Sequence, residues 1–357
     1  MLPEKGLKSW NLMLDPAPSY RPFIIPIFLP HGGCPHRCAF CNQTSITGAK
    51  SNVLAAEKIK LLINEFLKLK GKKRHSVQVA FFGGNFLGLA KDYIKLLLDE
   101  STKFVENGSV DSIRLSTRPD TIDRERLDIL ENYPVSTVEI GAQSMDDGVL
   151  DMAKRGHTAL DTEMAVTLLK ERNYAIGLQI MVGLPGDDET KSMFTAHRIT
   201  ELAPDFVRIY PTVVLANSLL ARWYQKKIYA PWPLKRCVTL VKKLYLFFSS
   251  KKIKVIRMGL QASEDFEQGA TIVAGPYHPA FGHMVHSEIF LDMATSILDK
   301  EKASHDPVAI KVHPRSISKM RGLRNKNVET LKRKFHIKSL EIIPDSSLAE
   351  DRLAVSS

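Results

Sequence analysis

The chain has 357 residues, of which 44% are hydrophobic and 25% are charged, so it can bury a core and should be globular. No run of about 18 apolar residues occurs, which argues against a transmembrane helix. The first eleven residues contain no apolar signal region, so we expect a cytoplasmic protein without a membrane contact.

Beyond a lead-in rich in proline, the chain predicts alternating strands and helices. The expected strands are 23–29, 77–82, 112–117, 137–142, 175–182 and 206–211, and the expected helices are 54–70, 93–105, 123–131, 160–172 and 190–202. This alternation predicts an α/β fold with a parallel sheet, and six repeats suggest a partial (β/α)6 TIM-type barrel or an open sheet. In both folds the active site should lie at the carboxyl ends of the strands. The cysteine loop and most of the candidate binding residues described below follow or end such strands.

The pattern changes after residue 211. We expect helices at 232–249, 284–298 and 328–335, strands at 255–259, 308–312 and 340–343, and a loop rich in Gly and Pro at 261–282. In that loop Tyr277 and His278 are candidate catalytic residues, since Tyr can donate hydrogen and His can move a proton; a stiff crossover is the alternative. These patterns divide the chain into a lead-in (1–20), a barrel (21–260), a basic, small α+β C-terminal extension (261–345) and a frayed tail (346–357).

The formal net charge of +11 is concentrated near the C-terminus. Between Pro307 and Lys338 ten Lys or Arg residues stand against one acid, Glu329. Such a basic stretch often binds a polyanion such as RNA, and a solvated helical face is an equally weighted alternative.

Three of the four cysteines, Cys34, Cys38 and Cys41, have the spacing C-x3-C-x2-C directly after the first expected strand. Three thiolates can hold three irons of a 4Fe-4S cluster and leave the fourth iron open to a small molecule. A zinc site completed by His31 or His36 is the alternative, although zinc usually takes two ligand pairs set further apart.

With Phe40 before the last cysteine, this motif resembles that of the radical S-adenosylmethionine (SAM) superfamily. The resemblance implies a 4Fe-4S cluster and SAM as cofactors, cleavage of SAM to a 5′-deoxyadenosyl radical, and an electron donor such as ferredoxin or flavodoxin. Later segments are similar to SAM-binding segments of the same family. They add to Phe40 the candidate SAM contacts Gly83, Gly84, Asn85, Ser116, Arg118, Gln143, Arg155 and Gln179.

Asn85 stands where the family usually has Glu, and Ser116 where an acidic residue is usual, so both contacts are altered. Arg155 matches an arginine that pairs with the SAM carboxylate, and a guanidinium suits this task because it binds carboxylates through two hydrogen bonds.

Two segments, 116–120 and 208–213, resemble the radical SAM half of the Elongator catalytic subunit and its bacterial relatives. This resemblance covers roughly residues 20–345 and implies action on RNA, in particular tRNA. The basic 307–338 stretch is the expected contact with the RNA. The acetyltransferase domain that normally follows is absent, so we expect no complete acetyl transfer by this chain alone. The alternatives are a small-molecule enzyme of the oxygen-independent coproporphyrinogen dehydrogenase type and a non-catalytic RNA-binding module.

Overall fold

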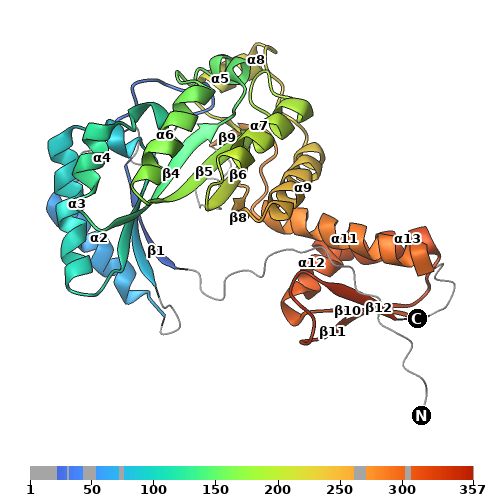
Figure 1. Cartoon of the computed structure of the whole chain (residues 1–357). Coiled ribbons are helices and arrows are strands. Elements are labelled where there is room, and N and C mark those ends of the chain that lie inside the picture. The colour runs from blue at the N-terminus through green and yellow to red at the C-terminus, as the bar shows by residue number, and fades with distance from the viewer. Residues whose placement is uncertain are drawn as a thin grey trace. The chain divides into compact units, whose positions relative to one another are not determined.

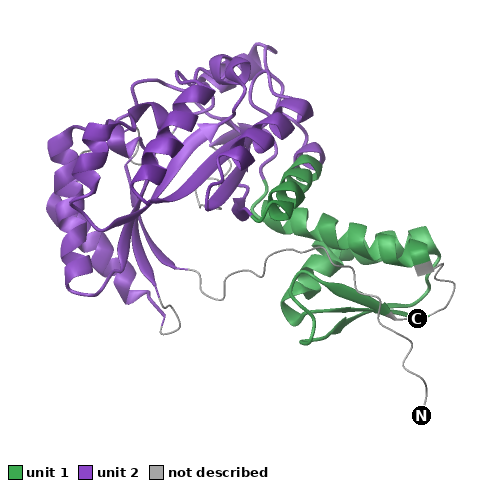
Figure 2. Cartoon of the chain, in the orientation of Figure 1, with its two compact units in different colours: residues 1–17, 238–252, 278–357 green, residues 18–237, 253–277 purple. Residues whose placement is uncertain are grey.

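The computed structural model describes residues 22–29, 32–42, 54–71, 76–260, 271–301 and 307–356. The chain forms two compact units (Figure 2). The larger unit contains residues 18–237 and 253–277, and the smaller one residues 1–17, 238–252 and 278–357.

The larger unit is built on a seven-stranded sheet in the order β1-β2-β3-β4-β5-β6-β8, with every neighbouring pair parallel. Its strands are β1 (Phe23–Phe28), β2 (Val77–Phe82), β3 (Ser112–Thr117), β4 (Val135–Gln143), β5 (Ala175–Val182), β6 (Phe206–Pro211) and β8 (Lys254–Met258). Helices cover the outer face of the curled sheet, which is a partial TIM-type barrel as predicted (Figure 1). They include α2 (Ala56–Lys68), α3 (Lys91–Glu106), α4 (Arg124–Leu130), α6 (Ala159–Glu171) and α7 (Glu189–Glu201).

Side-chain caps fix where the outer helices begin. At the start of α6 the Thr158 hydroxyl accepts the N–H of Asp161, and the Asp161 carboxylate accepts the N–H of Thr158. Asp123 and Asp188 cap α4 and α7 through the N–H three residues on. Each cap satisfies a backbone donor that the helix leaves free, so the loop between strand and helix has a defined end.

Several short elements were not predicted. The helices α5 (Asp147–Met152) and α8 (Leu219–Gln225) lie in segments without a clear apolar period. Residues 261–270 of the predicted loop lie outside the described residues, but the loop prediction is wrong for β9 (Ile272–Ala274), which pairs antiparallel with β7 (Val214–Leu215). Strands this short have too few residues for an alternating pattern to be visible.

The smaller unit contains a three-stranded sheet in the order β11-β10-β12. Its central strand β10 (Val308–Val312) pairs parallel with β11 (Leu340–Pro344) and antiparallel with β12 (Leu353–Ser356). The prediction of a frayed tail is therefore wrong for β12, because Leu353 and Ala354 are buried. The helices α11 (Phe281–Glu301), α12 (Ile317–Arg321) and α13 (Lys326–Phe335) complete the α+β fold of this unit, together with residues 238–250 of α9 (Leu234–Ser250).

Across the described ranges, no helix combines the length and the apolar character needed to cross a membrane.

Candidate active site

The cysteine loop, residues 32–42, follows β1 and is held by segments that follow several other strands. The Asn85 N–H, after β2, donates to the Gly32 carbonyl at 2.8 Å. The Ala39 N–H donates to the Ala153 carbonyl, after β4, at 2.9 Å, and the Ala39 carbonyl accepts the Leu220 N–H at 2.8 Å. The cysteines therefore lie at the carboxyl edge of the barrel, as the sequence predicts.

Glycines let the cysteine loop pack this closely against the end of β2. Gly33 has a φ of +70°, and a Cβ atom there would lie 2.2 Å from the Asn85 carbonyl oxygen. A Cβ atom on Gly84 would lie 2.4 Å from the Leu29 carbonyl oxygen. Any larger residue at either position would push the cysteine loop away from the barrel.

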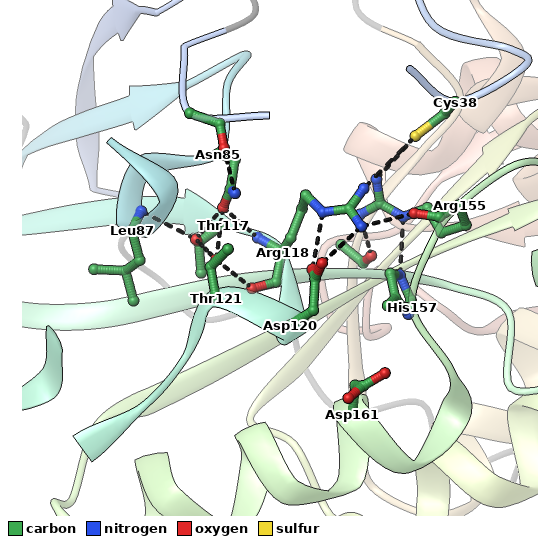
Figure 3. Close-up of polar contacts among 12 residues, drawn as sticks. Cys38, Asn85, Leu87, Thr117, Arg118, Asp120, Thr121, Arg155, His157 and Asp161 are labelled. Atoms are coloured by element: carbon green, nitrogen blue, oxygen red, sulfur yellow. Dashed lines mark hydrogen bonds and ion pairs between the residues drawn. The ribbon is translucent and has the colours of Figure 1, made fainter. Parts of the chain in front are cut away.

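Two guanidinium groups face the buried thiol of Cys38 (Figure 3). Arg155 Nη1 lies 3.2 Å from Cys38 Sγ, and Arg118 Nη1 lies 3.9 Å from the same atom. Burial raises the pKa of Cys34, and the charge on Cys38 adds to this, while Arg155 and Arg118 act in the opposite direction. The arginines thus favour the thiolate form that an iron ligand requires, and binding would release the Cys34 proton.

The donor set suits a 4Fe-4S cluster, because three thiols on one loop can each bind a different iron. Among the described residues, no group of three His, Cys, Asp or Glu side chains is placed to hold a single metal ion. Of the two histidines considered as zinc ligands, His31 lies outside the described residues, and the ring of His36 packs against Gly156. The thiols and the two guanidiniums therefore form a suitable cradle for the cluster.

Both arginines are fixed by further hydrogen bonds. Arg118 Nε and Nη2 donate to the two carboxylate oxygens of Asp120 at 2.8 and 2.9 Å, and Nη2 also donates to the Arg155 carbonyl at 2.7 Å. Arg155 Nη2 donates to the Gly141 carbonyl at 2.7 Å, and Arg155 Nε donates to His157 Nε2 at 2.9 Å. A guanidinium carries five N–H donors, so Arg155 keeps donors for a carboxylate ligand.

His157 must be neutral to accept the hydrogen bond from Arg155. Burial and the nearby Arg155 charge lower its pKa from 6.5 to about 4. The unfolded chain therefore binds this proton before the folded one does, so stability should fall as the pH drops from about 6.5 to 4. The expected loss is about 3 kcal/mol at 1.36 kcal/mol per pKa unit.

The His157→Gln variant isolates this contribution, because its amide can replace both ring nitrogens without titrating. The free energy of unfolding of both cluster-free proteins is measured in urea. The wild-type value minus the variant value should decrease as the pH is lowered from 7 to 4. A difference that stays constant across this range would contradict the assignment.

Asn85 is fully buried, and its side chain joins the cysteine loop to the end of β3. Its Nδ2 donates to the Gly33 carbonyl at 2.8 Å. Its Oδ1 accepts from the Thr117 hydroxyl, the Arg118 N–H and the Thr121 hydroxyl at 2.6, 3.0 and 2.8 Å. A Glu carboxylate could not donate to Gly33, so the structure explains why an amide stands here. A contact of Asn85 with SAM stays a prediction.

The other predicted SAM contacts lie at or near the same edge. Gln179 Nε2 donates to Gln143 Oε1 at 3.3 Å, which joins β5 to β4. Phe40 packs against two buried clusters, one containing Leu220 and the other Leu184. Gly83, with a φ of +92°, follows β2, and Ser116 lies on β3 in register with Glu139 of β4. Their contacts with SAM stay predictions.

The two candidate catalytic residues have structural contacts of their own. Tyr277 packs against the apolar cluster of Val213 and Leu215 in the larger unit. His278, in the smaller unit, accepts the Ala280 N–H through Nδ1 at 3.0 Å. A catalytic role for either residue stays a prediction.

A buried charge network inside the barrel was not predicted from the sequence. Glu139 on β4 accepts from Arg114 Nη1 at 3.1 Å, and its other oxygen lies 2.7 Å from Arg208 Nε. Strands of parallel barrels are usually apolar, so charged residues within β3, β4 and β6 were the available signal. With two cations and one anion, the network carries one net positive charge.

A parallel half-barrel with three cysteines on the loop after its first strand defines a radical SAM type of protein. Comparison with family models agrees: residues 28–195 match the radical SAM superfamily, and residues 204–290 match the radical SAM C-terminal domain. The chain belongs to the radical SAM superfamily. It is accordingly an enzyme of the radical SAM type, with a 4Fe-4S cluster and SAM as its cofactors.

Relatives place the chain near the Elongator catalytic subunit. A tRNA uridine(34) acetyltransferase of Dehalococcoides mccartyi is 26% identical over 232 residues, which are 56% of this chain and 50% of the relative. Elongator complex protein 3 of Schizosaccharomyces pombe is 25% identical over 200 residues, or 50% of this chain and 37% of the relative. This chain therefore spans half or less of either relative.

A solved structure, that of Methanocaldococcus infernus Elp3 with an N-terminal deletion, superimposes with a TM-score of 0.57 at 17% identity. The superposition covers 78% of this chain and 63% of that one. It confirms the predicted fold.

Proposed function

We propose that this radical SAM enzyme acts on tRNA, with Cys34, Cys38 and Cys41 as the ligands of its cluster. The contact of Arg155 with Cys38 is the observation that supports the assignment most directly. It brings the arginine predicted to bind the SAM carboxylate next to a predicted cluster ligand. SAM bound to the open iron would need its carboxylate at this place.

The residues around the cysteines have distinct tasks in this proposal. When bound, the cluster supplies the electron that cleaves SAM. Arg155 orients the SAM carboxylate, while Arg118 stays occupied by Asp120 and stabilises the thiolates. Asn85 holds the cysteine loop in place through Gly33. A ferredoxin or flavodoxin is the proposed electron donor.

The choice of tRNA rests on two supports. The relative from Dehalococcoides mccartyi is named as a tRNA-modifying enzyme. The 307–338 stretch of this chain carries the cation excess that RNA binding requires. The proposal concerns the radical step on RNA and not acetyl transfer.

Two measurements test this function. The anaerobically reconstituted chain should bind tRNA with an affinity that falls steeply with salt, and dithionite should drive release of 5′-deoxyadenosine that tRNA stimulates. Absence of tRNA binding at low salt would overturn the substrate assignment. Release of 5′-deoxyadenosine without any effect of tRNA would favour a small-molecule substrate, and no release at all would favour a non-catalytic module.

A further inference from the structure

The smaller unit contains two short helices connected by a tight basic loop. The chain runs from β10 through α12, the loop and α13 into β11, and β10 and β11 pair in parallel. We call residues 321–326 (Arg-Gly-Leu-Arg-Asn-Lys) the basic loop. It is the turn between the two helices of a β-α-α-β unit.

The backbone of the basic loop is held in one conformation. Gly322 has a φ of +70°, and a Cβ atom there would lie 2.9 Å from the Asn327 side chain. The backbones of Arg324 and Asn325 both adopt the left-handed conformation, with φ values of 53° and 60°. Buried Asn327 anchors the loop by donating to the Ser287 carbonyl at 2.8 Å and the Lys319 carbonyl at 3.3 Å. Contacts of the buried Asn327 thus set the shape of the basic loop, while the side chains of residues 321 and 323–326 are exposed.

The cations of the basic loop have no acidic partner. Arg321, Arg324 and Lys326 are exposed, and none forms an ion pair with an acid in the described part of the chain. Nearby cations differ, since Arg315 pairs with Glu350 at 2.9 Å and Lys334 pairs with Asp299 at 3.0 Å. Acids therefore neutralise part of the 307–338 stretch and leave the loop itself positive.

We infer that the basic loop binds the sugar-phosphate backbone of single-stranded RNA. This inference rests on the proposed function and names the part of the chain that holds the RNA. A glycine-containing loop between two helices is a known way to clamp about four nucleotides by their backbone. Arg324 can bind a phosphate through two hydrogen bonds, and Lys326 supplies a second charge nearby. Leu323, which is 37% exposed, adds an apolar surface for a ribose or a base.

A single strand fits the loop better than a duplex does. Six residues reach only a few consecutive phosphates, whereas shape recognition of double-stranded RNA spans about 16 base pairs over two minor grooves. The predicted ligand is therefore an unpaired segment, such as a tRNA loop. Binding should depend little on base identity, because backbone contacts carry no sequence information.

The test compares two double variants of the full chain. Arg324→Gln/Lys326→Gln removes two cations from the basic loop. Lys58→Gln/Lys60→Gln removes two exposed cations from α2 and serves as the matched control. Each is titrated with an oligouridylate of about eight nucleotides and with an RNA duplex of equal length, at several salt concentrations. Thermal melting checks that both variants remain folded.

We expect the loop variant to bind the oligouridylate more weakly than the wild type does. The plot of log K against log salt should also become less steep, by about 1.4, at 0.7 for each lost phosphate contact. The control should keep the wild-type slope. Equal slopes for all three proteins, or preferential binding of the duplex, would overturn the inference. Release of 5′-deoxyadenosine by the wild type is measured in parallel. Its absence alongside loop-dependent binding would refute the enzymatic proposal and leave the loop assignment standing.

Discussion

Replacing Cys38 by alanine is expected to abolish cluster assembly and to reduce 5′-deoxyadenosine release by more than about 100-fold. Even residues that only orient a metal ligand change metal affinity or activity 10- to 100-fold when mutated, so loss of a ligand should cost more. Cys38 is also the thiol that both Arg118 and Arg155 face. The iron content, the visible absorption of the reconstituted chain and 5′-deoxyadenosine release measure the effect.

Cys237→Ala is the matched control, since it removes the cysteine outside the cysteine loop. Cys237 is fully buried in α9, and burial raises the pKa of its thiol to about 12. Such a thiol is inert and should not hold iron. The control should keep its cluster and its product release. Loss of the cluster in Cys237→Ala, with retention in Cys38→Ala, would refute the ligand assignment.

Apolar runs account for the part of the fold that the sequence predicts well. The strands β2, β5 and β6 begin and end at the predicted residues, because in a parallel sheet both faces of a strand are covered and most of each run is apolar. β10 in the smaller unit also begins and ends at the predicted residues, but there buried Val308, Ile310 and Val312 alternate with half-buried Ala309 and Lys311. Burial thus makes a strand visible in the sequence before any contact is known.

The details of the site depend on contacts between distant residues, which local patterns do not contain. The cysteine spacing and the place of Arg155 could be predicted from motifs. The hydrogen bonds of Asn85 with Gly33 and Thr117 could not, since they join positions 52 and 32 residues apart. The missed strand β12 has the same origin, because its four residues become a strand only by pairing with β10.

The buried network around Glu139 leads to the largest expected effect on stability. Glu139→Ala would leave Arg114 and Arg208 close together without their shared carboxylate. Removing one member of a buried ion pair typically costs about 3–5 kcal/mol, because the remaining charge is desolvated and unpaired. We expect a loss of this size in the free energy of unfolding, measured by urea unfolding of the cluster-free chain.

An exposed ion pair provides the control. Glu171, at the end of α6, lies 3.6 Å from Arg124, and both side chains are largely exposed. Glu171→Ala should cost less than about 1 kcal/mol, because water screens such pairs. Glu139→Gln separates charge from shape: it keeps an acceptor for one arginine and should be less harmful than alanine. If Glu139→Ala were no more destabilising than Glu171→Ala, water would have to reach both arginines, and the network around Glu139 would not be a buried one.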